Sequence, residues 1–136
     1  METDLATPLT DALLAIPDAE LSRKWERVQA WMAERFGFDT SVGVEGLLFL
    51  AGVQESGSGY NPGMEKEHKQ ATIMDGTYAV LAHAGLYERA GVETDGRPIW
   101  ARLETPPSLS IDDQEKLLRA ALVGYFEDVL PPGAVT

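Results

Sequence analysis

The run of residues 42–53, within VGVEGLLFLAGVQE, constrains the fold more than any other stretch of the chain. Its apolar residues point all round a helical wheel, so a helix here has no polar face and must be covered on every side. We expect a central helix with Thr40 or Ser41 as its cap. A buried strand is the alternative, because periodicity alone does not separate the two. The length of the run and its three glycines favour the helix.

Proline, glycine and capping residues predict four further helices. Asp18 and Ser110 are typical N-caps, whereas Gly37 and Gly85 are typical stops. The expected helices cover residues 8–16, 18–36, 64–83 and 110–129.

Two of these helices carry an apolar stripe at helical spacing, which predicts one buried face on each. The stripe of the second helix contains Leu21, Trp25, Val28, Met32 and Phe36. The stripe of the last helix contains Ile111, Leu118, Leu122, Tyr125 and Val129, widened by Leu117, Ala121 and Phe126.

Residues 86–103 change from helical to alternating periodicity, and Asp95-Gly96 supplies a turn signal between the two halves. This pattern predicts a β-hairpin. The expected fold is mainly α: a compact bundle of about five helices with one β-hairpin between the last two. We expect a single domain over residues 1–136, with a flexible tail at 131–136.

The charge balance excludes several classes of partner. The chain has 22 acidic and 11 basic residues, and its net charge of −11 disfavours nucleic acid and anionic membranes. It contains no cysteine, so disulfides and thiolate metal sites are excluded. Without a signal peptide or a membrane span, a cytoplasmic protein is expected. An acidic, lysine-poor composition is also typical of salt-loaded cytoplasms, and an ordinary solubility charge is the alternative.

The glycine-rich loop at residues 57–63 has the outline of a nucleotide-binding turn. However, Pro62 stands where the dinucleotide fingerprint needs its third glycine. Met64 and Glu65 replace the Lys-Ser/Thr pair of a phosphate loop. Glu65 and Glu67 would also repel a phosphate at the next helix. We therefore interpret the loop as a connector, with no cofactor.

The chain offers no convincing set of metal ligands. Glu65 and His68 lie at the Glu-x-x-His spacing of carboxylate-bridged metal sites, but Val80 stands where His83 would need its partner Glu. On one helix, His68 and His83 would be about 22 Å apart, which is too far for one ion. We expect no metal and no catalytic residue.

A helix followed by a hairpin is also the layout of a winged-helix domain. The helix at 64–83 and the hairpin at 86–103 are not basic, as a DNA-binding surface should be. This layout, if present, predicts a partner other than a phosphate backbone.

Aromatic residues outside the stripes are the best candidates for an interaction surface, because aromatics are enriched at protein interfaces. These are Trp31, Tyr60 and Trp100, with core packing as the alternative for each. Trp31, on the flank of its helix beside Lys24 and Arg35, is the first choice. A polar pocket near Glu55, Tyr60 and His68 is a separate candidate.

Three blocks of the sequence, GLLFLAGVQESG, LYERAGVETDGRPIWARLE and LLRAALVGYFEDVL, resemble parts of a small family of uncharacterised bacterial proteins. The resemblance covers less than half of the chain and includes no catalytic motif. It implies a cytoplasmic bacterial protein, and it carries over no functional residue.

The leading hypothesis is a non-enzymatic protein-interaction or assembly domain that forms a homodimer through the flank around Trp31. A second hypothesis is an enzyme or small-ligand-binding protein that uses the pocket near Glu55. A third is a winged-helix-like regulator.

Overall fold

The structure is a computed structural model that describes residues 8–37, 42–56, 65–94, 98–103 and 109–135. The described helices are α1 (Pro8–Leu14), α2 (Asp18–Phe36), α3 (Val44–Ser56), α4 (Lys66–His83) and α5 (Ile111–Val129). Strands β1 (Tyr87–Val92) and β2 (Pro98–Arg102) form an antiparallel hairpin between α4 and α5. The expected mainly helical fold with one hairpin is therefore confirmed.

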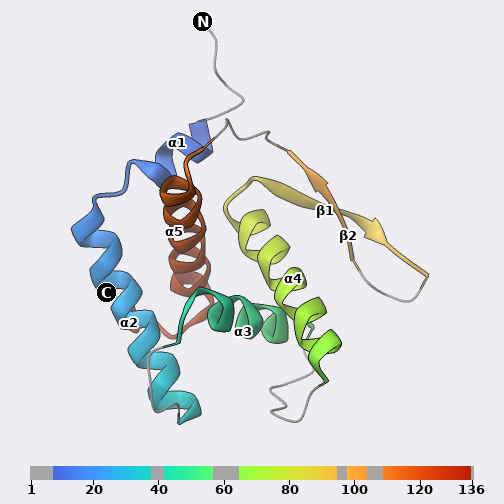
Figure 1. Ribbon diagram of the computed structural model, residues 1–136, viewed down its shortest axis with the longest axis horizontal. Coiled ribbons are helices and arrows are strands. Elements are labelled where there is room, and N and C mark those ends of the chain that lie inside the picture. Colours follow the sequence, from blue (N-terminus) through green and yellow to red (C-terminus); the bar gives the residue numbers. More distant parts are fainter. Residues whose placement is uncertain (1–7, 38–41, 57–64, 95–97, 104–108, 136) are drawn as a thin grey trace, which may run out of the picture.

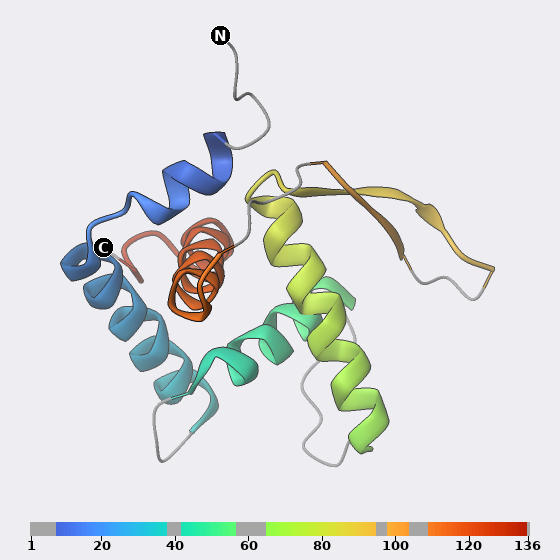
Figure 2. The same cartoon turned by 45° about the horizontal axis from the view of Figure 1, so that its top comes forward.

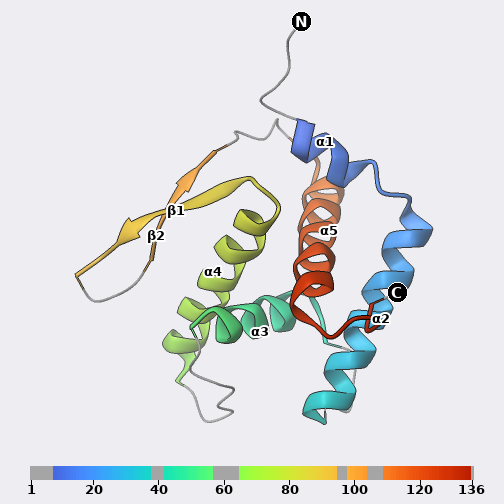
Figure 3. The same cartoon turned by 180° about the vertical axis from the view of Figure 1, so that it is seen from behind.

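Helix α3 crosses the base of the molecule, and α5 stands above it between α2 and α4 (Figure 1). The view from behind shows the same order, with the hairpin on the side opposite α2 (Figure 3). Helix α1 lies against the beginning of α5 (Figure 2). The core lies mainly between α2, α3 and α5, with Val80 contributed by α4, which also carries the hairpin outward.

The apolar stripe of α2 is buried along most of its length. Leu21, Trp25, Val28 and Met32 are each at most 5% exposed. The helix ends at Gly37, which adopts a left-handed conformation (φ 73°) and donates its N–H to the carbonyl of Ala33. The stripe as far as Met32 and the stop signal were therefore correctly predicted.

Helix α5 begins at its predicted cap. The Ser110 Oγ accepts a hydrogen bond from the Asp113 backbone N–H at 3.1 Å. Leu122, Tyr125 and Phe126 are at most 3% exposed and belong to the core. Burial of such side chains stabilises the fold by about 1.5–3 kcal/mol each.

The central apolar run is a helix, so the strand alternative is wrong. Leu47 and Ala51 are fully buried, and Leu48, Leu50 and Val53 are at most 9% exposed. These side chains point in several directions around α3, as expected for a helix that other elements surround.

Helices α3 and α4 make the most extensive contact between any two elements of the described structure. They meet through small residues, since the buried positions of α4 are Thr72, Gly76, Ala79 and Val80. A Cβ added at Gly76 would overlap the carbonyl oxygen of Leu48 and lie 2.7 Å from the backbone N of Gly52. A Cβ at Gly52 would overlap the carbonyl oxygen of Thr72. The two backbones therefore touch without side chains between them.

Aromatic stacking attaches the hairpin to α4. The strands pair Tyr87 with Arg102 and Arg89 with Trp100, with a bulge between Arg89 and Gly91. The ring of Trp100 stacks on Tyr78 of α4, with centroids 6.0 Å apart. Tyr87 meets the same Tyr78 ring edge-on at 5.2 Å. This contact matters because an isolated two-stranded hairpin is at best marginally stable in water.

Several detailed predictions were wrong at helix ends. Asp18 is the first residue of α2 and not its N-cap, and Pro17 precedes the helix without a side-chain cap bond. Phe36, Ile111 and Val129 are 38%, 81% and 40% exposed, although each was assigned to a buried stripe. Each of the three is the first or last residue of its helix, so the stripe reaches the helix end, whereas the elements that cover the stripe do not.

The final residues contribute to the core. Val135 is 3% exposed and belongs to the core cluster. The Arg27 guanidinium donates a hydrogen bond to the Gly133 carbonyl at 3.4 Å. The segment that was expected to be a flexible tail thus places one of its side chains, Val135, in the core. The flexibility of the segment stays a prediction.

Candidate functional site

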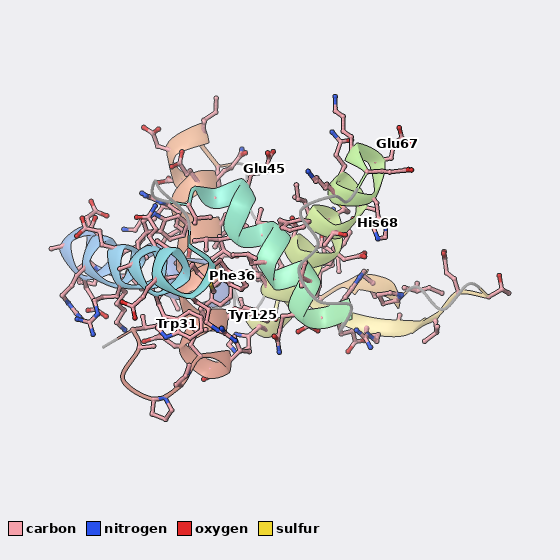
Figure 4. The ribbon with its side chains drawn as sticks, turned by 90° about the horizontal axis from the view of Figure 1, so that it is seen from below. Trp31, Phe36, Glu45, Glu67, His68 and Tyr125 are labelled. Atoms are coloured by element: carbon pink, nitrogen blue, oxygen red, sulfur yellow. The ribbon has the colours of Figure 1, made fainter. Side chains whose placement is uncertain are left out.

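An apolar groove of about 490 Å³ lies where α2, α3 and α5 meet. It is lined by Trp31, Met32, Arg35, Phe36, Leu50, Val53, Gln54, Phe126, Val129, Leu130 and Pro131. Only Arg35 and Gln54 among these are polar. In the view from below, Trp31 and Phe36 lie on the same side of the base of the molecule (Figure 4).

The ends of two helices create this groove. Met32, the last fully covered residue of the α2 stripe, forms part of its wall together with Leu50 and Phe126, which are 6% and 2% exposed. The next stripe residue, Phe36, and the last residue of α5, Val129, stand at the rim, 38% and 40% exposed. Exposed apolar residues beside a hollow are typical of protein-binding surfaces.

The groove lining itself carries a single charged side chain, Arg35. This guanidinium forms no ion pair with any described residue. Four carboxylates, Glu34, Glu55, Glu127 and Asp128, are next to lining residues in the sequence. Three of them contact other residues of the fold: Glu55 contacts Tyr125, Glu127 contacts Lys24 and Asp128 contacts His83. The groove therefore combines an apolar lining with neighbouring carboxylates that mostly contact other residues of the fold.

A pair of polar contacts ties α3, α4 and α5 together. The Tyr125 hydroxyl donates a hydrogen bond to the Glu55 Oε2 at 2.8 Å. Burial raises the pKa of Tyr125 above its ordinary value, and the bond to Glu55 adds to this shift. Beside it, the His83 Nε2 lies 2.6 Å from the Asp128 Oδ2, and the His83 ring meets the Tyr125 ring edge-on.

A second, polar groove of about 500 Å³ lies between the first turns of α2 and α5. Its basic residues are already engaged within the fold. Lys116 Nζ lies 2.8 Å from Asp18 Oδ1, and this contact lowers the pKa of Asp18. The Arg119 guanidinium lies over the Trp25 ring, 4.6 Å from its centre. These contacts join the two helices and leave mainly carboxylates toward solvent, an arrangement that does not suit an anionic ligand.

The predicted interface residues have separate positions. Trp31 is partly buried and lines the apolar groove, on the flank of α2 as expected. Trp100 packs between the hairpin and α4, under the Arg89 guanidinium at 5.4 Å. Tyr60 lies outside the described residues. The structure therefore does not bring Trp31 and Trp100 into one surface.

The two described residues of the predicted polar pocket do not converge either. Glu55 is bonded to Tyr125, whereas His68 is exposed near the first turn of α4. Figure 4 shows His68 well apart from Tyr125, on the side of α4. Across the described ranges, no three His, Asp or Glu side chains are placed to hold one metal ion.

Sequence reasoning missed two important groove residues. Phe36 and Val129 were assigned to buried stripes, because their spacing fits those stripes. The available signal was their position in the last turns, immediately before Gly37 and Leu130-Pro131, where a stripe residue lies beyond the reach of a shorter neighbouring element.

No family model, curated protein or solved structure matches this chain. None of the helices in the described part of the chain has both the length and the apolar character needed to cross a bilayer.

Proposed function

We propose that this protein is a non-enzymatic assembly domain that forms a homodimer, with the apolar groove between α2, α3 and α5 as the contact surface. One observation carries the proposal. The groove brings Phe36 and Val129, 38% and 40% exposed, together around one apolar hollow. The more exposed apolar residues lie outside it: Met74, Val92, Ile99, Leu103 and Ile111. A rim of large apolar side chains around an apolar hollow gains free energy when a partner excludes water from it.

A second copy of the chain fits this surface because the groove combines a projection with a hollow. In a two-fold interface the same patch is used by both copies, so a projection on one meets the hollow of the other. Phe36 stands at the end of α2 beside the space lined by Leu50 and Phe126. Phe36 of each copy therefore inserts into the groove of the other.

Charge also favours a second copy. Arg35 in the groove and the exposed Glu34 beside it have no ion-pair partner among the described residues. About a two-fold axis near the end of α2, Arg35 of one copy faces Glu34 of the other. Such pairs at an interface fix orientation more than they add affinity.

The test is sedimentation equilibrium of the full chain over a dilution series. We expect a reversible monomer–dimer equilibrium. Phe36→Gln removes the inserted ring and should raise the dimer Kd at least about tenfold, since central aromatic residues dominate interface energies. Val129→Gln should have the same effect, to a smaller extent.

Met74→Gln is the matched control, because Met74 is 53% exposed on α4, outside the groove. It should leave the dimer Kd unchanged. A strictly monomeric protein at high concentration would contradict the proposal, and so would a dimer that Phe36→Gln and Met74→Gln affect equally.

A further inference from the structure

We propose that the outer edge of β2 is a second self-association surface, on which another copy of the chain adds its own β2 as an antiparallel strand. The two hairpins then form one continuous sheet. The inference goes beyond the proposed function, because none of the residues that line the apolar groove belongs to the hairpin. The hairpin also lies on the side of the molecule opposite α2 (Figure 3). One chain can therefore use both surfaces at once.

The hairpin has edges to which further strands can be added. In the described structure β1 and β2 form a two-stranded sheet, so each strand has a strand neighbour on one side only. The hairpin extends outward beyond α4 (Figure 2). An unpaired edge strand offers a row of backbone N–H and C=O groups to another chain. A further strand also stabilises a two-stranded hairpin, which is marginally stable by itself.

Of the two strands, β2 has the less protected edge. Folded proteins protect exposed edge strands with bulges and with charged residues. β1 has both features, since a bulge lies between Arg89 and Gly91, and Glu88 and Arg89 are charged. β2 has no bulge of its own, and Arg102 is its only charged residue. The edge of β2 is therefore the one that suits pairing with another chain.

The backbone groups that face this edge belong to Trp100 and Arg102. Leu103 donates its N–H to the carbonyl of Leu86, directly before β1, at 2.8 Å. In an antiparallel strand, successive residues direct their N–H and C=O groups to opposite sides. Leu103 and Ala101 therefore face β1, whereas Trp100 and Arg102 face outward.

A two-fold axis between the Ala101 residues of two antiparallel β2 strands brings complementary groups together. Trp100 of each copy then lies opposite Arg102 of the other, and these residues exchange both of their backbone hydrogen bonds. Ile99 of each copy lies opposite Leu103 of the other. These two side chains are 42% and 54% exposed, so their pairing removes apolar surface from water. No like charges lie directly opposite each other, which would be destabilising.

The neighbouring register is less favourable. An axis at Trp100 places Arg102 opposite Pro98, which has no backbone N–H to donate. It also places the exposed Ile99 opposite the smaller Ala101, so less apolar surface is covered. The sequence of β2 therefore selects the register that is centred on Ala101.

The contact is small, because only one edge strand of each copy takes part. It lies below the usual size of a stable dimer interface and forms at higher protein concentration than the groove dimer. Dimers that have formed through the groove are then joined through their hairpins into larger species. This follows because one chain carries two self-complementary surfaces.

Sedimentation equilibrium of the Phe36→Gln chain tests the β2 edge, because this substitution weakens the groove dimer. We expect this chain still to form a dimer at high protein concentration. A further Ile99→Lys substitution places an ammonium group opposite Leu103 of the other copy and should raise the dimer Kd at least about tenfold. Val92→Lys is the matched control, since Val92 is 62% exposed on β1, and it should change the Kd less than about threefold.

Addition of Leu103→Glu to Ile99→Lys tests the register. In the paired sheet, position 99 of one copy lies opposite position 103 of the other, so the new ammonium and carboxylate groups attract each other. Within one chain these positions are about 13 Å apart along the strand, too far for a direct contact. The Kd should therefore return to within about threefold of the value for the Phe36→Gln chain.

The outcomes separate this inference from the proposed function. A Phe36→Gln chain that is monomeric at every concentration overturns the inference and leaves the groove dimer supported. A dimer that Ile99→Lys does not weaken, or that Leu103→Glu does not restore, also overturns the inference. If Ile99→Lys weakens the native dimer and Phe36→Gln does not, the β2 edge is supported and the groove proposal fails.

Discussion

The α2–α5 and α3–α4 contacts use opposite means to hold helices together. Large side chains lie between α2 and α5, including Trp25, Val28 and Leu122, which are at most 4% exposed. Between α3 and α4, Gly52 and Gly76 allow the backbones to touch. Side chains can shift when a neighbour changes, but a backbone in a helix cannot. We therefore expect the first contact to tolerate changes of shape and the second to tolerate no added atom.

The largest effect is expected from deletion in the α2–α5 contact. Leu122 is fully buried, so Leu122→Ala leaves a cavity and should lower the free energy of unfolding by about 3–4 kcal/mol. Leu122→Met, which keeps the volume, should cost less than about 1.5 kcal/mol. Urea denaturation followed by circular dichroism measures both. If both variants lose the same free energy of unfolding, the α2–α5 contact is as intolerant of a change of shape as the α3–α4 contact.

Addition of a single methyl group to the α3–α4 contact should cost nearly as much. Gly76→Ala places a Cβ against the carbonyl oxygen of Leu48, and we expect a loss of about 3 kcal/mol. Helix propensity alone predicts the opposite sign, a gain of about 1 kcal/mol. The same denaturation experiment decides between the two.

Gly124→Ala is the control for that experiment. Gly124 lies within α5, and an added Cβ there meets no atom within 4 Å. This variant should be stabilised by up to about 1 kcal/mol. If Gly76→Ala and Gly124→Ala shift stability in the same direction, α3 and α4 are not in backbone contact.

The smallest effect on stability is expected from the hydrogen bond that Tyr125 of α5 donates to Glu55 of α3. This bond links the α2–α5 pair to the α3–α4 pair. Tyr125→Phe should lower the free energy of unfolding at neutral pH by about 1 kcal/mol. Because the pKa of Tyr125 is raised in the folded protein, its contribution is present below about pH 10 and is lost as pH rises further.

Denaturation at pH 7 and at pH 10–11 checks the sign of this pH dependence. The unfolded chain releases the tyrosine proton first, so the stability of the native protein falls above pH 10. The Tyr125→Phe variant lacks this pH-dependent contribution. The difference in free energy of unfolding between the native protein and the variant should therefore become smaller above pH 10. If this difference in free energy of unfolding stays constant up to pH 11, the Tyr125 hydroxyl titrates in the folded protein as it does in the unfolded chain.

The same contrast explains which parts of the fold could be predicted. Stripes such as Leu21, Trp25 and Val28 follow from helical spacing, because a helix repeats every 3.6 residues wherever it packs. The Ser110 cap and the Gly37 stop are equally local. The close approach of Gly52 and Gly76 is not local, because each glycine is explained only by the other helix.

The candidate site was predicted in part for the same reason. Trp31 was identified because it lies outside the stripe of its own helix, which can be seen on a single element. Phe36 and Val129 were assigned to the core, because their spacing does not show where the neighbouring helix ends. Glu55 was identified as interesting, but its bond to Tyr125 joins residues far apart in the sequence.

The sequence by itself determined the helices, the hairpin, most of the buried stripes and the excess of negative charge, because these depend on near neighbours and on composition. The tertiary structure decided that α3 and α4 touch through glycine and that the ends of α2 and α5 leave Phe36 and Val129 beside an apolar groove. The reason is physical: burial depends on which distant segment covers a residue, and no local periodicity encodes that segment's length.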